Sequence, residues 1–397
     1  MKLKYRLSAI VISILVVIVA AISIILLNHA AKMQMESAHT SQERLAAEQA
    51  RILQIHYETY LHTVYILADT LSDFDKADVG RQRNRFDQFM ESILQSEERV
   101  VGIFTVFKPN TIDPGIDAAF AELPGSTKTG QWANWYTRQS GKVEHRTFDN
   151  VEGIMHTITG ENARKEMIYD PVPQTVGGRD TYTVMITVPV IHRKTNEIVG
   201  RAGINIDMAL TQPIVDNIIN DPTLRDISAM TVYSNNGTVI ASYAAEHIGK
   251  PLTEAQNTLY DENTNRARDA VLKGEKERFS KYSDNLRKNL EIILYPFTIG
   301  ETGANWSLML ATEKNIILED VNALTFFTLI IGIAAAFIAA VIVFIISGNI
   351  ARPIVRVSLT LKDISEGEGD LTKTVNVNSK DEIGDLARYF NATLEKI

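Results

Sequence analysis

The sequence of 397 residues contains no cysteine. This absence excludes disulfide bridges, cysteine-ligated metal centres and catalysis by a thiol nucleophile. An excess of basic residues is missing as well, because 40 Lys and Arg stand against 48 Asp and Glu, a formal net charge of −8. Proteins that bind nucleic acid need a basic surface to neutralise phosphates, so we expect no nucleic-acid partner.

Motifs for catalysis or metal binding are also lacking. The eight His are scattered, and His56 and His62 lie six positions apart, which places them on different sides of a helix. The pair Gly177 and Gly178 is not followed by a helix carrying Lys or Ser, as a phosphate-binding loop requires. We therefore expect no enzymatic activity, no bound metal and no cofactor in this chain.

Two long apolar runs, residues 7–27 and 324–347, contain no charged side chain. A helix of about 21 residues rises roughly 32 Å, which matches the hydrocarbon core of a bilayer. The first run is longer than the apolar core of a cleaved signal peptide, and no small-residue cleavage site follows it. Both runs are therefore expected to be transmembrane helices.

Basic side chains flank the two runs on the sides that face the chain ends: Lys2, Lys4, Arg6, Arg352 and Arg356. Positively charged flanks remain in the cytoplasm, so residues 1–6 and the region after the second span are expected there. Residues 28–320 are then expected outside the membrane. For a bacterial cell this predicts an inner-membrane protein with a periplasmic domain.

The region from residue 28 to 71 is expected to form one long stalk helix, because no Pro or Gly interrupts residues 32–72. Its apolar and aromatic positions recur at spacings of three, four or seven: Leu45, Ile52, His56, Tyr60, Val64, Leu67 and Leu71. This seam favours pairing with a second copy of the chain, hence a homodimer. The alternative is that the seam packs only against its own domain.

After the stalk, short runs rich in β-branched and aromatic residues alternate with turn signals. The clearest is the stretch 227–243, in which Asn236-Gly237 separates two apolar runs and predicts a hairpin. These runs predict two α/β modules with antiparallel sheets, at residues 72–210 and 211–320. The fold class is therefore α+β, with the first module farther from the membrane.

Beyond the second span, two helical stripes are separated by a Gly-rich connector that carries Val375 and Val377. The stripes consist of Ile354, Val357, Leu361 and Ile364, then Ile383, Leu386, Phe390, Leu394 and Ile397. Two such helices make half of a parallel four-helix bundle, and a second chain would supply the rest. Pro353 suits the first turn of the first helix. The alternative is a pair of surface helices that pack on another domain.

Several motifs, in order, resemble those of the double Cache chemoreceptors: NWYTRQSGK, GGRDTYTVMITVPV, VGRAGINIDM, the hairpin YSNNGTVIASY and YPFTIG. The motifs ARP, GDL and DEIG after residue 350 resemble a HAMP linker, at residues 348–397. The resemblance implies PAS-like Cache modules and a methyl-accepting chemotaxis protein. It also implies a cytoplasmic coiled coil after residue 397 that binds a coupling protein and a kinase. The alternative is a sensor histidine kinase or a nucleotide cyclase whose catalytic domain lies beyond residue 397.

The resemblance also implies a ligand site in the first module. Trp135 and Tyr136 match an aromatic pair of the amino-acid-sensing members, and Asp207 matches an aspartate that holds the ligand ammonium. The arginine that pairs the ligand carboxylate is replaced by Ala133, and a tyrosine-x-aspartate motif by residues 172–174. An amine or a modified amino acid is therefore expected rather than a standard amino acid. Further candidate lining residues are Arg138, Asp170 and Tyr182.

Overall fold

The computed structural model describes residues 3–395 except 77–80, 256, 367–373 and 376–381. The chain divides into two compact units. One unit comprises Met1–Glu36 with Leu318–Ile397, and the other comprises Ser37–Ile317. Helix α1 (Leu3–Leu71) contributes to both units.

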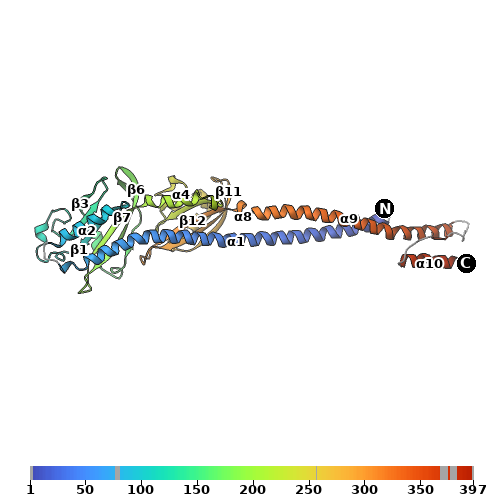
Figure 1. Ribbon diagram of the computed structural model, residues 1–397, viewed down its shortest axis with the longest axis horizontal. Helices are drawn as coiled ribbons and strands as arrows, with labels where there is room; N and C mark the ends of the chain where they lie inside the picture. The colour runs from blue at the N-terminus through green and yellow to red at the C-terminus, as the bar shows by residue number, and fades with distance from the viewer. Residues whose placement is uncertain (1–2, 77–80, 256, 367–373, 376–381, 396–397) are drawn as a thin grey trace. The chain divides into compact units, whose positions relative to one another are not determined.

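In the unit Ser37–Ile317, α1 lies along one face of two successive β-sheets (Figure 1). Its buried side chains recur every three or four residues, which forms one apolar stripe on the helix: Ala46, Ala50, Leu53, Tyr57, Leu61, Val64 and Leu71. Residues of both sheets belong to the same core cluster as this stripe. The two modules therefore share a core that is built on one helix.

The first sheet has seven strands in the order β3-β2-β1-β7-β6-β4, with β5 paired to β6. All of its pairings are antiparallel. The strands are β1 (Val100–Phe107), β2 (Ala133–Thr137), β3 (Glu144–Thr147), β4 (Met167–Ile168), β5 (Val172–Val176), β6 (Arg179–Ile191) and β7 (Ile198–Asp207).

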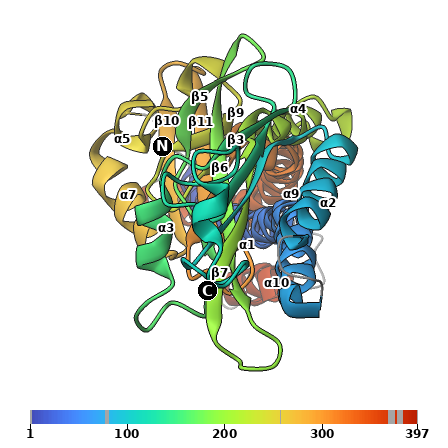
Figure 2. The same ribbon diagram turned by 90° about the vertical axis from the view of Figure 1, so that its left-hand side faces the viewer.

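Helices cover both faces of this sheet, and Figure 2 shows α2 and α3 on opposite sides of the strands. On one face α2 (Gln82–Ser96) and α1 pack against the strands. On the other face α3 (Val151–Thr157) and Phe148 form a smaller apolar cluster with Phe104 and Trp135.

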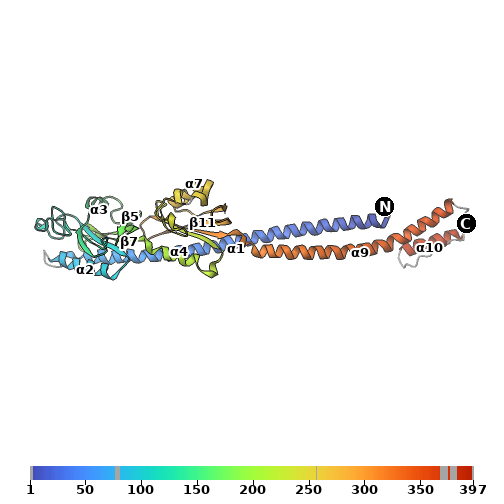
Figure 3. The same ribbon diagram turned by 90° about the horizontal axis from the view of Figure 1, so that it is seen from above.

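The second sheet has five antiparallel strands in the order β10-β11-β12-β8-β9. The strands are β8 (Ile227–Tyr233), β9 (Val239–Ser242), β10 (Glu277–Ser283), β11 (Lys288–Thr298) and β12 (Asn305–Glu313). Helices α1 and α4 (Gln212–Ile219) cover one face. The other face carries α5 (Leu252–Ala255), α6 (Asn257–Tyr260) and α7 (Thr264–Lys273), and α7 is prominent in Figure 3.

Hydrogen bonds at two places join the first module to the second, and another pair of bonds ties α4 to the sheet of its own module. Asp170 of the first module accepts a hydrogen bond from the backbone N–H of Asn236 in the second at 3.2 Å. Within the second module, the side chain of Gln212 bonds both the carbonyl and the N–H of Ser242, at 2.9 and 3.0 Å. Buried Glu166 accepts from the N–H of Glu301 at 2.5 Å and from the Tyr65 hydroxyl of α1. These bonds fix the two sheets relative to each other along α1.

The other unit contains the two apolar runs, in α1 and in α9 (Glu319–Glu366). Each helix includes an 18-residue stretch with a mean hydropathy of 3.4 or 3.2, long and apolar enough to cross a membrane. Pro353 lies inside α9 and not in the first turn of a separate helix, so that expectation is wrong. The helical residues on both sides outweigh the single backbone hydrogen bond that proline removes.

After α9, the chain returns as α10 (Glu382–Leu394). Val357 of α9, Val375 of the connector and Ala387 of α10 form a small buried cluster. The side chain of Asn391 accepts from the N–H of Val375 at 2.8 Å and donates to its carbonyl at 2.9 Å. Val377, Leu371 with its GDL motif, Asp381, Ile397 and the side chains of Ile364, Ile383 and Leu394 lie outside the described residues.

The predicted α+β class, the two antiparallel sheets and the hairpin at Asn236-Gly237 are confirmed. The predicted stalk seam is wrong in large part. Val64, Leu67 and Leu71 are completely buried against the chain's own sheets, so they are not available to a second copy. The apolar residues do share one side of the helix, but that side packs on the chain's own sheets and not on a second copy.

The buried guanidinium of Arg83 bonds several residues of the long connection between β1 and β2. Arg83 of α2 donates to Asp113 at 2.5 Å and to Asp117 at 2.9 Å, and both carboxylates are buried. It also donates to Ser126 at 2.7 Å and to the carbonyl of Gly130 at 2.8 Å. This network supplies the polar core of a segment that has few strands.

We predict that Arg83→Met destabilises the folded sensor region by about 3–5 kcal/mol, because two buried carboxylates lose their counterion. Tryptophan fluorescence during urea unfolding measures this, since Trp132, Trp135 and Trp306 all lie in the unit Ser37–Ile317. The matched control is Arg85→Met on the exposed side of α2, which should change stability by less than about 0.5 kcal/mol. Equal effects of the two substitutions would contradict the assignment.

Candidate functional site

The face of the first sheet that α3 covers is built from cross-strand rungs. Trp135, Phe104, Gly203 and Thr187 stand opposite one another on β2, β1, β7 and β6. The neighbouring rungs carry Thr137, Gly102, Asn205 and Met185, and Ala133, Val106, Arg201 and Pro189. Directly opposed residues of antiparallel strands project to the same side. We call this surface the Trp135 face.

Two glycines allow aromatic rings to lie flat on this face. A Cβ atom at Gly102 would lie 2.6 Å from Nε1 of Trp135, and one at Gly203 would overlap the ring of Phe104. Phe148 stacks on Phe104 with a centroid distance of 4.1 Å and meets Trp135 edge-on at 5.9 Å. The aromatic rings therefore form an apolar wall over the centre of the sheet.

Four polar atoms on the Trp135 face are buried without a hydrogen-bond partner among the described residues. They are Nε1 of Trp135, Oγ1 of Thr187, Nε of Arg201 and Oδ1 of Asn205. Trp135 is 6 % exposed, and Thr187 and Arg201 are 0 % exposed. Burial of an unpaired polar atom costs about 1–3 kcal/mol, so a polar molecule that bonds these four atoms, water included, would be stabilised on this face.

Arg201 is held from one side only. Its guanidinium donates to the carbonyl of Lys165 and contacts Sδ of Met167, while Nε remains unpaired. Burial lowers the pKa of this guanidinium from its ordinary value, because desolvation penalises the charged form. Arg201 thus presents a positive donor to the Trp135 face, and no carboxylate in the described part of the chain forms an ion pair with it.

Asp207 lies at the end of β7, on the same side of the sheet. Its carboxylate accepts hydrogen bonds from Arg179 at 2.5 Å, from Thr181 at 2.6 Å and from the N–H of Ala209 at 2.9 Å. The last bond caps the turn Met208–Leu210. Its negative charge is therefore compensated by Arg179 in this structure.

Tyr136 points to the opposite side of the sheet from Trp135, since successive residues of a strand alternate. It packs in the core cluster that contains α2, and its ring stacks on His145 at 4.4 Å. Burial raises the pKa of its phenol, and Asp87 and Glu91 of α2 add to the effect. The strand does not bring Trp135 and Tyr136 into one site.

The remaining predicted residues lie elsewhere. Arg138 donates to the carbonyls of Leu94 and Glu98 at the end of α2. Asp170 bonds the second module, and burial raises the pKa of its carboxyl. Tyr182 lines a cleft between the two modules. Of the six predicted residues, the structure brings Trp135 and Asp207 to the Trp135 face, whereas Tyr136 and Tyr182 pack on the opposite side of the sheet.

Sequence analysis missed Thr187, Asn205 and Gly102 as partners of Trp135. A signal was present, because polar residues occupy alternate positions of β6 at Thr181, Thr183 and Thr187. Alternation shows that these residues share a side of the strand. The register that brings Thr187 opposite Gly203, and so level with Trp135, required the structure.

Comparison with known proteins identifies a domain family in the C-terminal region. The HAMP domain family matches residues 345–397. The chain is 24% identical over 336 residues to the methyl-accepting chemotaxis protein TlpQ of Pseudomonas aeruginosa, covering 78% of this chain and 45% of TlpQ. The chain is a homologue of methyl-accepting chemotaxis proteins. It spans about half the length of the curated relatives it matches first.

Two solved structures share the fold of the sensor region of this methyl-accepting chemotaxis protein homologue. The extracellular domain assigned to the histidine kinase mmHK1S-Z2 superposes with a TM-score of 0.57 at 18% identity, covering 71% of this chain and 99% of that domain. The periplasmic sensory domain of the Campylobacter jejuni chemoreceptor Tlp1 gives 0.51 at 13%, covering 72% and 98%. At these identities the likeness shows the fold alone, so the kinase alternative gains no support from it.

A second polar network lies on the α2 side of the first sheet of this homologue. The Asn134 side chain donates to Asp87 at 2.5 Å and lies 2.5 Å from Nε2 of His145. Burial raises the pKa of Asp87 to about 6, although Asn134 and Arg83 partly oppose the shift. Burial lowers the pKa of His145. The folded protein therefore binds a proton at Asp87 more tightly than the unfolded chain does.

We predict that Asp87 lowers the free energy of unfolding as the pH rises from about 4 to 6, the window between its unfolded and folded pKa values. Two pKa units correspond to roughly 2–3 kcal/mol. Asp87→Asn should therefore be more stable than the parent by about 2 kcal/mol at pH 7, with no difference near pH 4. Urea unfolding of both proteins across this range measures it. A difference that does not vary with pH would contradict the assignment.

Proposed function

We propose that this chain is the sensor and relay region of a transmembrane chemoreceptor that binds a small organic molecule at the Trp135 face. The observation that carries the proposal is the set of four buried, unpaired polar atoms on one side of one sheet. Its homology to methyl-accepting chemotaxis proteins and its HAMP domain support a signalling role. No reaction is proposed for this region.

The chemistry of the unpaired atoms indicates the kind of ligand. Trp135 and Arg201 offer donors, Asn205 offers an acceptor, and Thr187 can serve as either. The rings of Phe104, Phe148 and Trp135 offer an apolar wall. A modified amino acid fits this set, with its acceptor group toward Trp135 and Arg201 and its amino group toward Asn205. A simple amine would leave the two donors unsatisfied.

The proposed receptor spans the bacterial inner membrane twice, with residues 28–320 in the periplasm and the HAMP linker in the cytoplasm. The two apolar helices and the basic flanks support this orientation. By analogy with its relatives, the complete protein would bind a coupling protein and a kinase through a cytoplasmic signalling domain. Ligand binding would act on that domain by shifting the equilibrium between two packings of the helices.

We predict that Thr187→Val does not destabilise the free protein but weakens the binding of ligand. Removal of the unpaired hydroxyl should leave the free protein as stable or more stable by about 1 kcal/mol, while ligand affinity should fall about tenfold. A thermal-shift screen of the sensor region against amino acids, amines, purines and organic acids supplies the ligand. Thr105→Val, buried on the other side of β1, is the matched control. An unchanged affinity in Thr187→Val would contradict the site.

We further propose that the receptor is a homodimer that pairs through the exposed side of α1. Ile52, Ile55 and Ile66 are exposed by 43, 52 and 61 %. With Thr59 and His62 between them, they recur at spacings of three and four, which is the seam of a two-helix coiled coil. This stripe lies opposite the buried one, so α1 can pack on its own sheets and on a partner simultaneously.

A single-cysteine scan should reveal this dimer, because the chain has no cysteine of its own. Ile55→Cys is expected to form a disulfide-linked dimer in membranes under mild oxidation, since equivalent seam positions of a parallel pair face each other. Lys142→Cys, exposed on the turn between β2 and β3, is the control and should remain monomeric. Crosslinking of both variants, or of neither, would refute pairing through this seam.

A further inference from the structure

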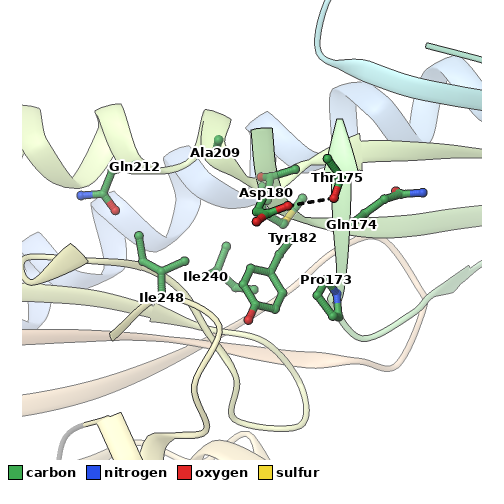
Figure 4. A pocket seen from close by; sticks show the side chains of 11 residues that line it. Pro173, Gln174, Thr175, Asp180, Tyr182, Ala209, Gln212, Ile240 and Ile248 are labelled. Atoms are coloured by element: carbon green, nitrogen blue, oxygen red, sulfur yellow. Dashed lines mark hydrogen bonds between the residues drawn. The ribbon is translucent and has the colours of Figure 1, made fainter. Parts of the chain in front are cut away.

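The structure contains a cavity whose lining includes none of Trp135, Thr187, Arg201 and Asn205. A cleft of about 660 Å³ lies between the two modules (Figure 4). The β5–β6 hairpin forms one wall, and Met208, Ala209 and Gln212 form another. Ile240 and Ile248 of the second module complete it. Its volume is typical of small-molecule sites, which occur preferentially where domains meet.

Contacts at the edge of the cleft hold its shape. The ring of Tyr182 packs on Gly249 so closely that a Cβ atom there would overlap the ring, and Gly249 has a φ of +82°. The bond between Asp170 and Asn236 joins the same two modules, and the two bonds between Gln212 and Ser242 hold the cleft wall formed by α4 against β9. The cleft is therefore bounded by both modules and is not a gap within one loop.

The lining of this cleft includes none of the four residues that carry the unpaired atoms of the Trp135 face. Thr181, which lies on the side of Asp207, and Tyr182, which lies on the other side of β6, both line the cleft at the end of the strand. Tyr182 itself packs against the core cluster that contains α1. A molecule in the cleft would touch the ring of Tyr182 without reaching the indole of Trp135.

The lining residues define the chemistry of an occupant. Tyr182, Met208, Ile240 and Ile248 provide an apolar wall. Apart from the Tyr182 phenol, Asp180 is the only ionisable side chain among the lining residues, and no Lys or Arg is among them. Oδ1 of Asp180 accepts from Thr175 at 2.8 Å, and Oδ2 has no partner among the described residues. An apolar wall beside one available carboxylate suits a cation with an apolar body.

We propose that the cleft between the modules is a second ligand site, which binds small organic cations that carry an aromatic or aliphatic body. Asp180 pairs with the ammonium group, and Tyr182 with Ile240 and Ile248 contacts the body. Because both modules line the site, its occupant stabilises the arrangement in which the modules are held together. The cleft thus gives the receptor an input that is independent of the Trp135 face.

The test uses benzylamine as the probe and the full chain in lipid nanodiscs, with binding measured by isothermal titration calorimetry. Benzylamine is expected to bind with millimolar or better affinity, and benzoate, which has the same ring and the opposite charge, is not. Asp180→Asn should weaken benzylamine about fivefold, as expected for one partly exposed ion pair. Ala209→Phe, which fills the cleft and leaves Asp180 intact, should abolish binding.

Two controls separate this site from others. Asp149→Asn removes an exposed carboxylate on the connection before α3 and should leave the affinity unchanged. Trp135→Phe should also leave it unchanged, because the probe does not reach that face. Equal binding of benzoate, undiminished binding to Asp180→Asn and Ala209→Phe, or no binding of benzylamine would overturn the proposal. A loss confined to Trp135→Phe would also overturn it, because the amine would then occupy the Trp135 face.

Discussion

The packing of α1 on both sheets is the constraint on which the sensor region depends. Its buried stripe enters the same core cluster as Trp306 of the second sheet and Ile103 of the first, and Tyr57 lies 4.9 Å from the Trp306 ring. On the face that α1 covers, the core of each sheet includes side chains of this helix. A change in one module therefore alters a surface that the other module also contacts, and this is the physical basis on which binding at one place can be felt at the other.

Hydrogen bonds connect the same elements in addition to this shared core. Glu166, in the segment before β4, joins α1 to the turn after β11 through Tyr65 and Glu301. The residues on either side of Glu166 contact Arg201, whose other edge belongs to the Trp135 face. The segment from Lys165 to Met167 is thus held by Arg201 of the Trp135 face and by Tyr65 of α1.

Much of the fold could be predicted from the sequence because its signals are local. Uncharged runs, alternation in β6 and β7, and the Asn236-Gly237 turn each report their own segment. The site could not be predicted in the same way. Adjacent aromatic residues drew attention to Trp135 and Tyr136 together, whereas the pleat of β2 separates them. Asn205 and Thr187 join Trp135 only through pairings between distant strands, and the stalk seam was misassigned because competition between partners is a property of the whole fold.

The position of Trp135 next to Tyr136 on β2 has a consequence for the diversity of such sensors. Strand β2 bears a tryptophan on one side of the sheet and a tyrosine on the other, so insertion of a single residue as a bulge between β2 and β1 would exchange the two rings. The face under α3 would then acquire a phenol in place of an indole, with every contacting strand left where it is. One codon gained or lost would in this way change the chemistry of the proposed ligand site without altering the rest of the fold.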